Sequence, residues 1–211
     1  MHYVGKKIKW VVCHYKDDFS WIYGYTNDFI IHDRSEDNKY TKTLSKENYV
    51  IEKNVGYNIF CYMDYIVNNY ENLPDRVLFC KDNMLQRHIT KSEFDACLKK
   101  EGFVPLLTQN HITDGKTAMY INGLYHEINN SWYLWAYPHK YYREYADFAK
   151  DFNLPNPPYL PFAPGACYIV PRENIHRHTK DFYARLKELV SWHQTPAEAH
   201  LIERSLYNIW N

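Results

Sequence analysis

The side chains best suited to chemistry in this sequence are acids, amides and histidines that follow apolar runs. Asp82 and Asn83 follow the apolar residues 77–80, with Lys81 in between. Asp33 follows a second apolar run, which ends at His32. Ligands of open α/β folds bind where strands end. A hard divalent cation needs only one or two protein carboxylates when diphosphate oxygens complete its coordination. These residues therefore predict a strand-end site for a phosphate-bearing ligand and a metal ion.

The full set of candidates is distributed over three predicted strand ends. It comprises His14, Tyr15, Asp17, Asp18, Asp33, Arg34, Asp82 and Asn83. An isolated Asp-Asn pair more often begins a polar turn than a catalytic site. The hypothesis therefore requires that these strand ends meet at one edge of a sheet.

The elements that would position these residues alternate between strands and helices. Apolar runs predict strands over residues 8–14, 29–32, 49–51, 77–80, 117–121, 132–137 and 166–170. Before the fourth strand, Ile59, Met63 and Ile66 recur at helical spacing, and Pro74 ends that helix. This alternation predicts an α/β fold with a mixed, mostly parallel sheet flanked by helices.

Four further helices are predicted, together with one irregular segment. Thr90 and Glu93 have the spacing of a capping box, and Gly102 is placed to end the helix that they begin. Residues 141–152 form an amphipathic pattern, and two more helices contain Leu186 and Leu206. The proline-rich residues 154–165 predict a stretch without regular structure.

Composition excludes several classes of protein. The 25 basic and 25 acidic side chains give a formal charge of zero, which disfavours a nucleic-acid partner. The five cysteines are odd in number and scattered, which is typical of reduced core residues in the cytoplasm. The apolar residues 10–13 are too few for a signal peptide or a membrane span. We therefore expect a cytoplasmic protein without a membrane span.

Several common catalytic motifs are missing from the sequence. It contains no GxGxxG, GxxxxGK[ST], GxSxG or HExxH motif, which disfavours dinucleotide oxidoreductases, P-loop enzymes, serine hydrolases and zincins. His176 and His178 are two residues apart, and His193 and His200 are seven apart. Neither pair has the four-residue spacing of a helical zinc site.

The order of the polar strand ends resembles a known family. The nucleotide-binding half of GT-A glycosyltransferases resembles the part of the chain that contains, in this order, HYKDD, HDRS, NVGYN and VLFCKDN. Their acceptor half resembles the later segment GACYIVPREN with the last helices. The whole chain is similar to compact N-terminal glycosyltransferase domains encoded by chlorella viruses and implicated in capsid glycan synthesis. The resemblance implies one domain over residues 1–211, with a nucleotide-sugar-binding half of about 1–110 and an acceptor half of about 111–211. This domain would stand alone or be a module of a longer protein. The expected location is the cytoplasm of an infected cell.

The resemblance also implies a metal site, with one departure. GT-A enzymes typically carry Asp-x-Asp at the end of the central strand, whereas this chain has Cys80, Lys81 and Asp82 there. Only the final acid of the motif is present. By resemblance, Asp82 would bind Mn²⁺ or Mg²⁺ together with the two phosphates of a UDP-sugar donor.

The same resemblance assigns nucleotide contacts. His14 and Tyr15 would line a uracil pocket, and Asp33 would accept a hydrogen bond from uracil N3–H. Gly56, followed by Tyr57, would allow the backbone to approach the nucleotide closely. The alternatives are aromatic packing for the two tyrosines, a turn for Asp33 and helix entry for Gly56.

An inverting enzyme of this family would also need a general base near the acceptor hydroxyl. Glu198 occupies the expected place at the start of a late helix, although with Thr195 and Pro196 it also fits a capping box. Asp114 and Glu203 are the competing candidates. Their alternatives are a turn for Asp114 and a helix-surface salt bridge for Glu203.

The sequence and the resemblance therefore predict a metal-dependent glycosyltransferase that moves a hexose or deoxyhexose from a UDP-sugar to a hydroxyl of a glycan acceptor. The expected setting is viral glycoprotein glycan synthesis. The transfer is expected to invert the configuration of the anomeric carbon. The high aromatic content of 18% leaves a non-catalytic carbohydrate-binding module as the alternative. A metal-dependent nuclease built on Asp17, Asp33 and Asp82 is a third hypothesis, which the neutral net charge disfavours.

Overall fold

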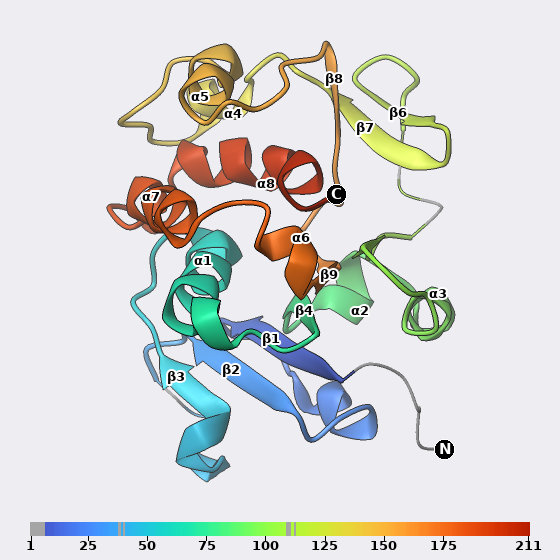
Figure 1. Ribbon diagram of the computed structural model, residues 1–211, viewed down its shortest axis with the longest axis vertical. Helices are drawn as coiled ribbons and strands as arrows, with labels where there is room; N and C mark the ends of the chain where they lie inside the picture. The colour runs from blue at the N-terminus through green and yellow to red at the C-terminus, as the bar shows by residue number, and fades with distance from the viewer. Residues whose placement is uncertain (1–6, 38, 40, 109–110, 112) are drawn as a thin grey trace.

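A six-stranded mixed sheet forms the centre of the computed structural model, which describes residues 7–37, 39, 41–108, 111 and 113–211 (Figure 1). Its strands are β1 (Ile8–His14), β2 (Phe29–Asp33), β3 (Tyr49–Ile51), β4 (Arg76–Lys81), β5 (Val104–Pro105) and β9 (Tyr168–Pro171), in the order β3-β2-β1-β4-β9-β5. The pairs β3–β2, β2–β1 and β1–β4 are parallel, whereas β9 is antiparallel to both β4 and β5. The predicted mixed, mostly parallel sheet is confirmed.

Both faces of this sheet are buried, which explains the continuous apolar runs of its strands. In β1, Trp10 and Val12 belong to one core cluster, while Val11 and Cys13 belong to the other. Successive side chains of a strand point to opposite faces, so a strand covered on both sides has no polar alternation. The apolar patterns of β1 and β4 therefore identify the central strands.

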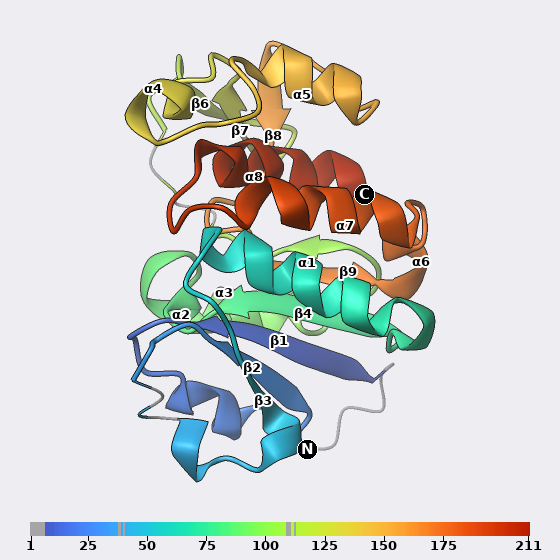
Figure 2. The same cartoon turned by 90° about the vertical axis from the view of Figure 1, so that its left-hand side faces the viewer.

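The helices cover the sheet in layers, which Figure 2 shows edge-on. They are α1 (Tyr57–Asn69), α2 (Met84–Arg87), α3 (Lys91–Cys97), α4 (Tyr133–Ala136), α5 (Tyr145–Asp151), α6 (Arg172–Ile175), α7 (Lys180–Val190) and α8 (Ala197–Trp210), with short 3₁₀ helices η1 (Ser20–Gly24), η2 (Thr41–Thr43), η3 (Lys46–Asn48) and η4 (Tyr70–Asn72). Helix α1 packs against β1, and α7 and α8 pack on α1. Residues of η1, α2 and α3 close the opposite face.

A second, antiparallel sheet lies beyond α8 (Figure 2). It consists of β6 (Ala118–Ile121), β7 (Leu124–Ile128) and β8 (Tyr159–Pro161), with β7 in the middle. The prediction that residues 154–165 have no regular structure is wrong for β8. This strand is at the sheet edge and Pro161 is its last residue, a position in which a missing backbone donor is tolerated.

The strand predicted over residues 132–137 is also wrong, because α4 is there. Trp132 and Trp135, three residues apart, are exposed, whereas the adjacent Tyr133 and Leu134 are both buried. Neighbouring residues share a face in a helix but not in a strand. Since all six residues from 132 to 137 are aromatic or aliphatic, the sequence contains no polar pattern that could distinguish a helix from a strand.

Two predicted helices are shorter than their patterns suggested. The capping box of Thr90 and Glu93 is present and begins α3, but the helix ends at Cys97, before Gly102. Helix α5 begins at Tyr145 rather than at residue 141. The Tyr145 N–H donates to the Ser131 hydroxyl (2.8 Å). A long-range hydrogen bond therefore decides where this helix starts.

Gly56 precedes α1 in a left-handed conformation, with φ of 63°. A Cβ at this position would lie 2.8 Å from the carbonyl oxygen of Val190 and 2.9 Å from its Cβ. The close approach that Gly56 permits is thus between α1 and the end of α7. The structure supports its role in helix entry and packing, which was the alternative to a nucleotide contact.

Substitution of Gly56 should destabilise the fold more than substitution of an equally strained glycine in open space. Gly115 has φ of 70°, and a Cβ at this position would meet nothing within 4 Å, so Gly115→Ala should cost only about 1–2 kcal/mol for the left-handed backbone. Gly56→Ala should cost about 1–3 kcal/mol more because of overpacking. Urea denaturation measures both. Equal losses in the two variants would refute tight packing at Gly56.

Candidate functional site

The ends of β1 and β4 meet at the point where the strand order reverses. From β1 the chain continues to β2 and β3 on one side, whereas β4 pairs on the other side. Cys13 and Lys81 are register partners at this edge. In open α/β sheets, ligands bind in the crevice outside such a switch point. The topology therefore brings together the strand ends that carry His14 and Asp82.

Asp82 is a buried carboxylate that organises this edge. Its Oδ2 accepts hydrogen bonds from His14 Nδ1 (3.0 Å) and from the backbone N–H groups of Tyr15 (2.9 Å) and Asp17 (3.2 Å). Its Oδ1 accepts from the N–H of Asn83 (2.9 Å). Burial raises the pKa of Asp82, but the bonds from His14 and the backbone outweigh burial and lower it below its usual value. Asp82 is therefore ionised and ties the loop after β1 to β4.

Two of the predicted nucleotide contacts have structural partners instead. His14 is fully buried, bonds to Asp82 and packs edge-on against Phe19, with ring centroids 4.9 Å apart. Asp33 is fully buried as well, and its carboxylate accepts from Ser35 N–H (2.8 Å) and from the Thr41 hydroxyl (2.5 Å). His14 thus supports Asp82, and Asp33 closes a turn after β2.

A cavity of about 230 Å³ lies at this edge, and we name it the Arg34 cavity. It is lined by Cys13, Tyr15, Asp17, Arg34, Tyr57, Asn58, Lys81, Asp82, Asn83 and Arg87. Tyr15 and Tyr57, two of the predicted nucleotide contacts, therefore do lie at the cavity. The Arg34 guanidinium lies 5.6 Å from the centre of the Tyr15 ring, close to the predicted uracil pocket.

Arg34 is an unusual component of this cavity because it is only 7% exposed. Its side chain donates a long hydrogen bond to Asn54 Oδ1 (3.4 Å), and its Nε has no partner in the described part of the chain. Among these residues no carboxylate forms an ion pair with it, although the Cys13 thiol is a hydrogen-bonding neighbour. A buried charge is costly unless it is paired. Arg34 therefore favours an anionic ligand.

Lys81 and Arg87 add two further cations to the lining. Neither forms an ion pair with the residues that the structure describes. Arginine binds phosphate oxygens in a bidentate manner, and lysine binds them as a point charge. Together with Arg34, these side chains give the cavity the chemistry of a diphosphate site.

The acidic side of the same cavity fits a hard cation. Asn83 donates through Nδ2 to Asp17 Oδ2 (2.6 Å) and through its N–H to Asp82 Oδ1 (2.9 Å), so it brings the two carboxylates together. The Asn83 Oδ1 is buried and has no hydrogen-bond partner among the described residues. Carboxylate and amide oxygens are the ligands that Mg²⁺ and Mn²⁺ prefer. Asp82 thus remains the predicted ligand, and Asp17 and Asn83 would share that role.

Another cluster, His32, Glu52 and Asp64, has potential ligand atoms within 4.8 Å of one another. His32 Nδ1 lies 2.9 Å from Glu52 Oε1, and Asp64 Oδ1 accepts from Lys187 Nζ at 2.5 Å. The Lys187 ammonium already supplies a positive charge to these acids. The cluster is therefore explained as an ion-pair network that joins β2 and α1 to α7.

A second cavity, of about 340 Å³, adjoins the first, and we name it the Glu203 cavity. The two share Tyr57, Asn58, Lys81 and Arg87, and the second is completed by Ile59, His88, Tyr137, Gly165, Ala199, His200 and Glu203. Burial and the charge of Lys81 lower the pKa of His88 to about 4, so its imidazole is neutral at pH 7. The shared lining makes one continuous groove from Arg34 to Glu203.

Glu203 is the acid of this second cavity. Its Oε1 accepts from Gly165 N–H (2.7 Å), and its Oε2 lies 3.5 Å from His200 Nδ1 and 3.6 Å from Arg204. Burial raises the pKa of Glu203, but His200 and Arg204 outweigh it and lower the pKa to about 2. Glu203 is therefore an oriented, ionised carboxylate.

The other two candidates for a general base have structural partners. Glu198 is fully buried, and its Oε1 accepts from the N–H groups of Lys140 (2.7 Å) and Tyr141 (2.8 Å). Asp114 is exposed and accepts from the N–H groups of Lys116 (2.8 Å) and Thr117 (2.7 Å) in a turn. Of the three predicted acids, Glu203 is the one that lines the groove.

Sequence reasoning did not single out Lys81, Arg87 or Tyr137, and it considered His200 only as a zinc ligand. Lys81 had a signal, since it occupies the middle of the triplet that ends in Asp82. His200 precedes Glu203 by three residues, which places both on one face of a helix. No sequence motif marks Arg87 or Tyr137 as a site residue. Only the folded chain brings them to the groove.

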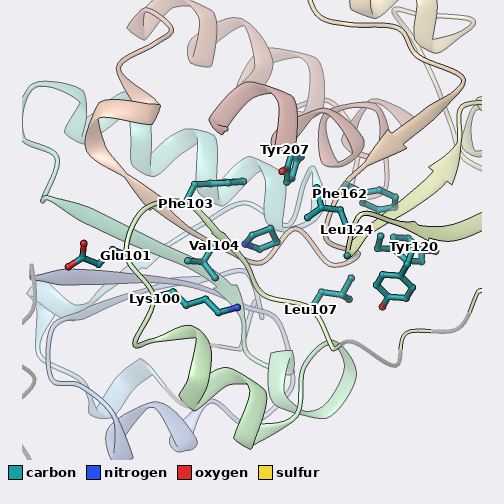
Figure 3. A pocket seen from close by; sticks show the side chains of 12 residues that line it. Lys100, Glu101, Phe103, Val104, Leu107, Tyr120, Leu124, Phe162 and Tyr207 are labelled. Carbon is teal, nitrogen blue, oxygen red and sulfur yellow. The ribbon is translucent and has the colours of Figure 1, made fainter.

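A third cavity, of about 200 Å³, is separate from the groove (Figure 3). Aromatic and aliphatic side chains dominate its lining, and Figure 3 shows Phe103 and Tyr207 on one side and Tyr120 on the other. None of the predicted site residues lines it. The polar groove is therefore the candidate functional site.

The fold and the groove define an open α/β protein with a crevice lined by Arg34, Lys81 and Arg87 at the carboxyl edge of its sheet. The chain belongs to the family DUF3431, described as a protein of unknown function, whose profile matches residues 10–211. No curated protein and no solved structure matches it. Within the described ranges, no helix is long and apolar enough to cross a membrane.

The lowered pKa of Glu203 predicts a specific pH dependence of stability. A carboxyl group whose pKa falls from 4.5 to about 2 on folding stabilises the native state above pH 4.5, and this contribution is lost as the pH falls toward 2. Glu203→Gln should therefore lose less stability than the wild type between pH 5 and 2. Denaturant unfolding at several pH values measures this difference.

Glu188→Gln, at an exposed position of α7, is the matched control and should retain the wild-type pH dependence. An identical loss in Glu203→Gln and the wild type would contradict the bonding described for Glu203.

Proposed function

We propose that this protein is a glycosyltransferase that moves a hexose or deoxyhexose from a UDP-sugar to a hydroxyl group of a glycan acceptor. The observation that carries this proposal is the buried Arg34 guanidinium, which lacks a carboxylate partner among the described residues and lines a cavity at the switch point of the sheet. The order of the strand-end motifs, which resembles that of GT-A enzymes of viral glycan synthesis, supports the same function in the cytoplasm of an infected cell.

The groove has suitable places for the parts of such a donor. The uracil and ribose would lie beside Tyr15 in the Arg34 cavity, and the diphosphate would contact Arg34 together with Lys81 and Arg87, which both cavities share. The sugar would then extend into the Glu203 cavity. This arrangement separates the cationic end of the groove from the carboxylate that faces the acceptor.

A divalent cation, Mn²⁺ or Mg²⁺, is part of this proposal. Asp82 Oδ1, Asp17 and the unpartnered Asn83 Oδ1 would hold it. When bound, such an ion stabilises the negative charge of the departing diphosphate. Arg34, Lys81 and Arg87 would act on the same charge from the protein side.

Glu203 is the proposed general base of an inverting transfer. The acceptor oxygen forms a bond to the anomeric carbon, the bond from that carbon to the diphosphate oxygen breaks, and the hydroxyl proton passes to Glu203. A pKa of about 2 makes Glu203 a weak base in the free protein. The proton would therefore pass to Glu203 late in the step, because the hydroxyl becomes strongly acidic once its oxygen bonds to carbon.

Arg34→Met tests the donor site. Removing a buried charge without a carboxylate partner should leave the melting temperature of the free protein unchanged or higher, while UDP affinity falls about 10- to 100-fold. The control is Arg76→Met, because Arg76 is equally buried but donates to the carbonyls of Lys100 (2.9 Å) and Gly102 (3.0 Å). That variant should be destabilised and should bind UDP normally.

Calorimetric titration with UDP and thermal unfolding give both readouts. If the wild type binds no UDP in the presence of Mn²⁺, or if Arg34→Met binds it as tightly as the wild type, the proposed donor site is wrong.

The metal ligands can be tested separately. Asp82 supports several backbone groups, so its removal would confound binding with folding. Asp17→Ala is the better variant, and it should abolish the additional thermal stabilisation that Mn²⁺ gives in the presence of UDP. Asp18→Ala removes an adjacent exposed carboxylate, which bonds to Ser20, and should retain it. Equal Mn²⁺ effects in the two variants would exclude Asp17 as a ligand.

A further inference from the structure

Part of the lining of the Glu203 cavity is aromatic. Tyr137 and His200 line the cavity, with ring centroids 4.5 Å apart. Tyr57 meets His200 edge-on at 5.5 Å, and Trp132 lies 6.4 Å from Tyr137. We call these four side chains the aromatic wall. Trp132 is 41% exposed, so the wall continues from the cavity to the surface.

The fold holds this wall in place. The carbonyl of Pro138, directly after Tyr137, accepts from Ala197 N–H (2.8 Å). Glu198 binds the N–H groups of Lys140 and Tyr141 in the same segment. Glu198 is therefore a positioning residue for the chain around Tyr137. A wall that is fixed before the ligand arrives loses little conformational entropy on binding.

The other end of the wall is fixed as well. Trp132 Nε1 donates to Glu127 Oε1 (2.5 Å), and Arg204 donates to both oxygens of the same carboxylate (2.9 Å each). The Arg204 guanidinium also lies 5.5 Å from the centre of the Trp132 ring. One face of the indole is thus supported by the protein.

The chemistry of the wall selects a neutral, amphipathic ligand. Its rings offer flat apolar faces, and Glu203, in the same cavity, accepts hydrogen bonds. A pyranose has one face of C–H bonds, which packs on an aromatic ring through dispersion and burial, and a rim of hydroxyl groups. The cations of the groove lie around Arg34 and, as Lys81 and Arg87, where the two cavities meet.

We propose that the aromatic wall binds a saccharide, with the apolar face of a pyranose ring on Tyr137 and a hydroxyl group directed toward Glu203. This inference rests on the proposed function in assigning the saccharide as the acceptor. It adds the place where the acceptor binds and the residues that recognise it.

Saturation-transfer NMR tests this binding with defined probes. The probes are the methyl glycosides of glucose, galactose, mannose, xylose, fucose and N-acetylglucosamine, each measured in the presence of UDP and Mg²⁺. The wild type should saturate at least one of them, most strongly at the C–H protons of one ring face. Tyr137→Ala should weaken that signal about fivefold, as expected for a lost aromatic stacking contact.

Trp135→Ala is the matched control. Trp135 lies in α4, between the wall residues Trp132 and Tyr137 in sequence, and is 88% exposed, but it does not line the cavity. The saccharide signal should remain in this variant. Tyr137→Leu keeps an apolar side chain but removes the aromatic face, so its saccharide signal should weaken as in Tyr137→Ala. An unchanged amide spectrum of Tyr137→Leu would show that the loss comes from stacking and not from misfolding.

The outcomes distinguish this inference from the proposed function. If no methyl glycoside is saturated by the wild type, or if the Tyr137 variants give the signal of Trp135→Ala, the saccharide site is refuted, whatever the UDP signal shows. If a glycoside binds through Tyr137 but UDP does not bind, the site stands and the transferase proposal fails in favour of a carbohydrate-binding module.

Discussion

The buried carboxylate of Asp82 is the interaction on which the rest of the groove depends. Three hydrogen bonds to its Oδ2 join the end of β4 to His14 and to the backbone of the loop after β1, and a fourth, from Asn83 N–H, holds its Oδ1. Without these bonds, the backbone N–H groups of that loop would lack their partners at a buried sheet edge, which is costly. Asp82 therefore has a structural role, and its Oδ1 retains the capacity to contact a ligand or ion.

The groove is organised by a separation of charge along its length. Cations surround one end, where Arg34 is buried without a carboxylate partner in the described chain, and the middle, where Lys81 and Arg87 line both cavities. The far end combines an ionised Glu203 with the aromatic wall. A ligand with a charged diphosphate and a neutral ring system matches this order. The same low dielectric that makes the buried charge of Arg34 costly strengthens its attraction for an anion.

Much of the fold followed from local patterns, and the failures have a common cause. The continuous apolar runs identified β1, β2 and β4, and the capping box at Thr90 identified the start of α3. Residues 132–137 and β8 were misjudged because their conformation depends on contacts with distant residues. The start of α5 is decided in the same way, by the hydroxyl of Ser131. Periodicity reports which residues are buried only where polar and apolar residues alternate with a clear period.

For the site, the sequence by itself determined which chemical groups stand at the strand ends, including Asp82, Tyr15 and Arg34, because strand ends are marked by the change from apolar to polar residues. Tertiary structure alone decided the role of each acid. Glu198, Asp114 and Glu203 are alike as side chains, and each accepts from a backbone N–H group, yet only Glu203 of the three lines the groove. The reason is physical: hydrogen-bond partners and burial, which determine whether a carboxylate can act on a ligand, come from segments far apart in the chain.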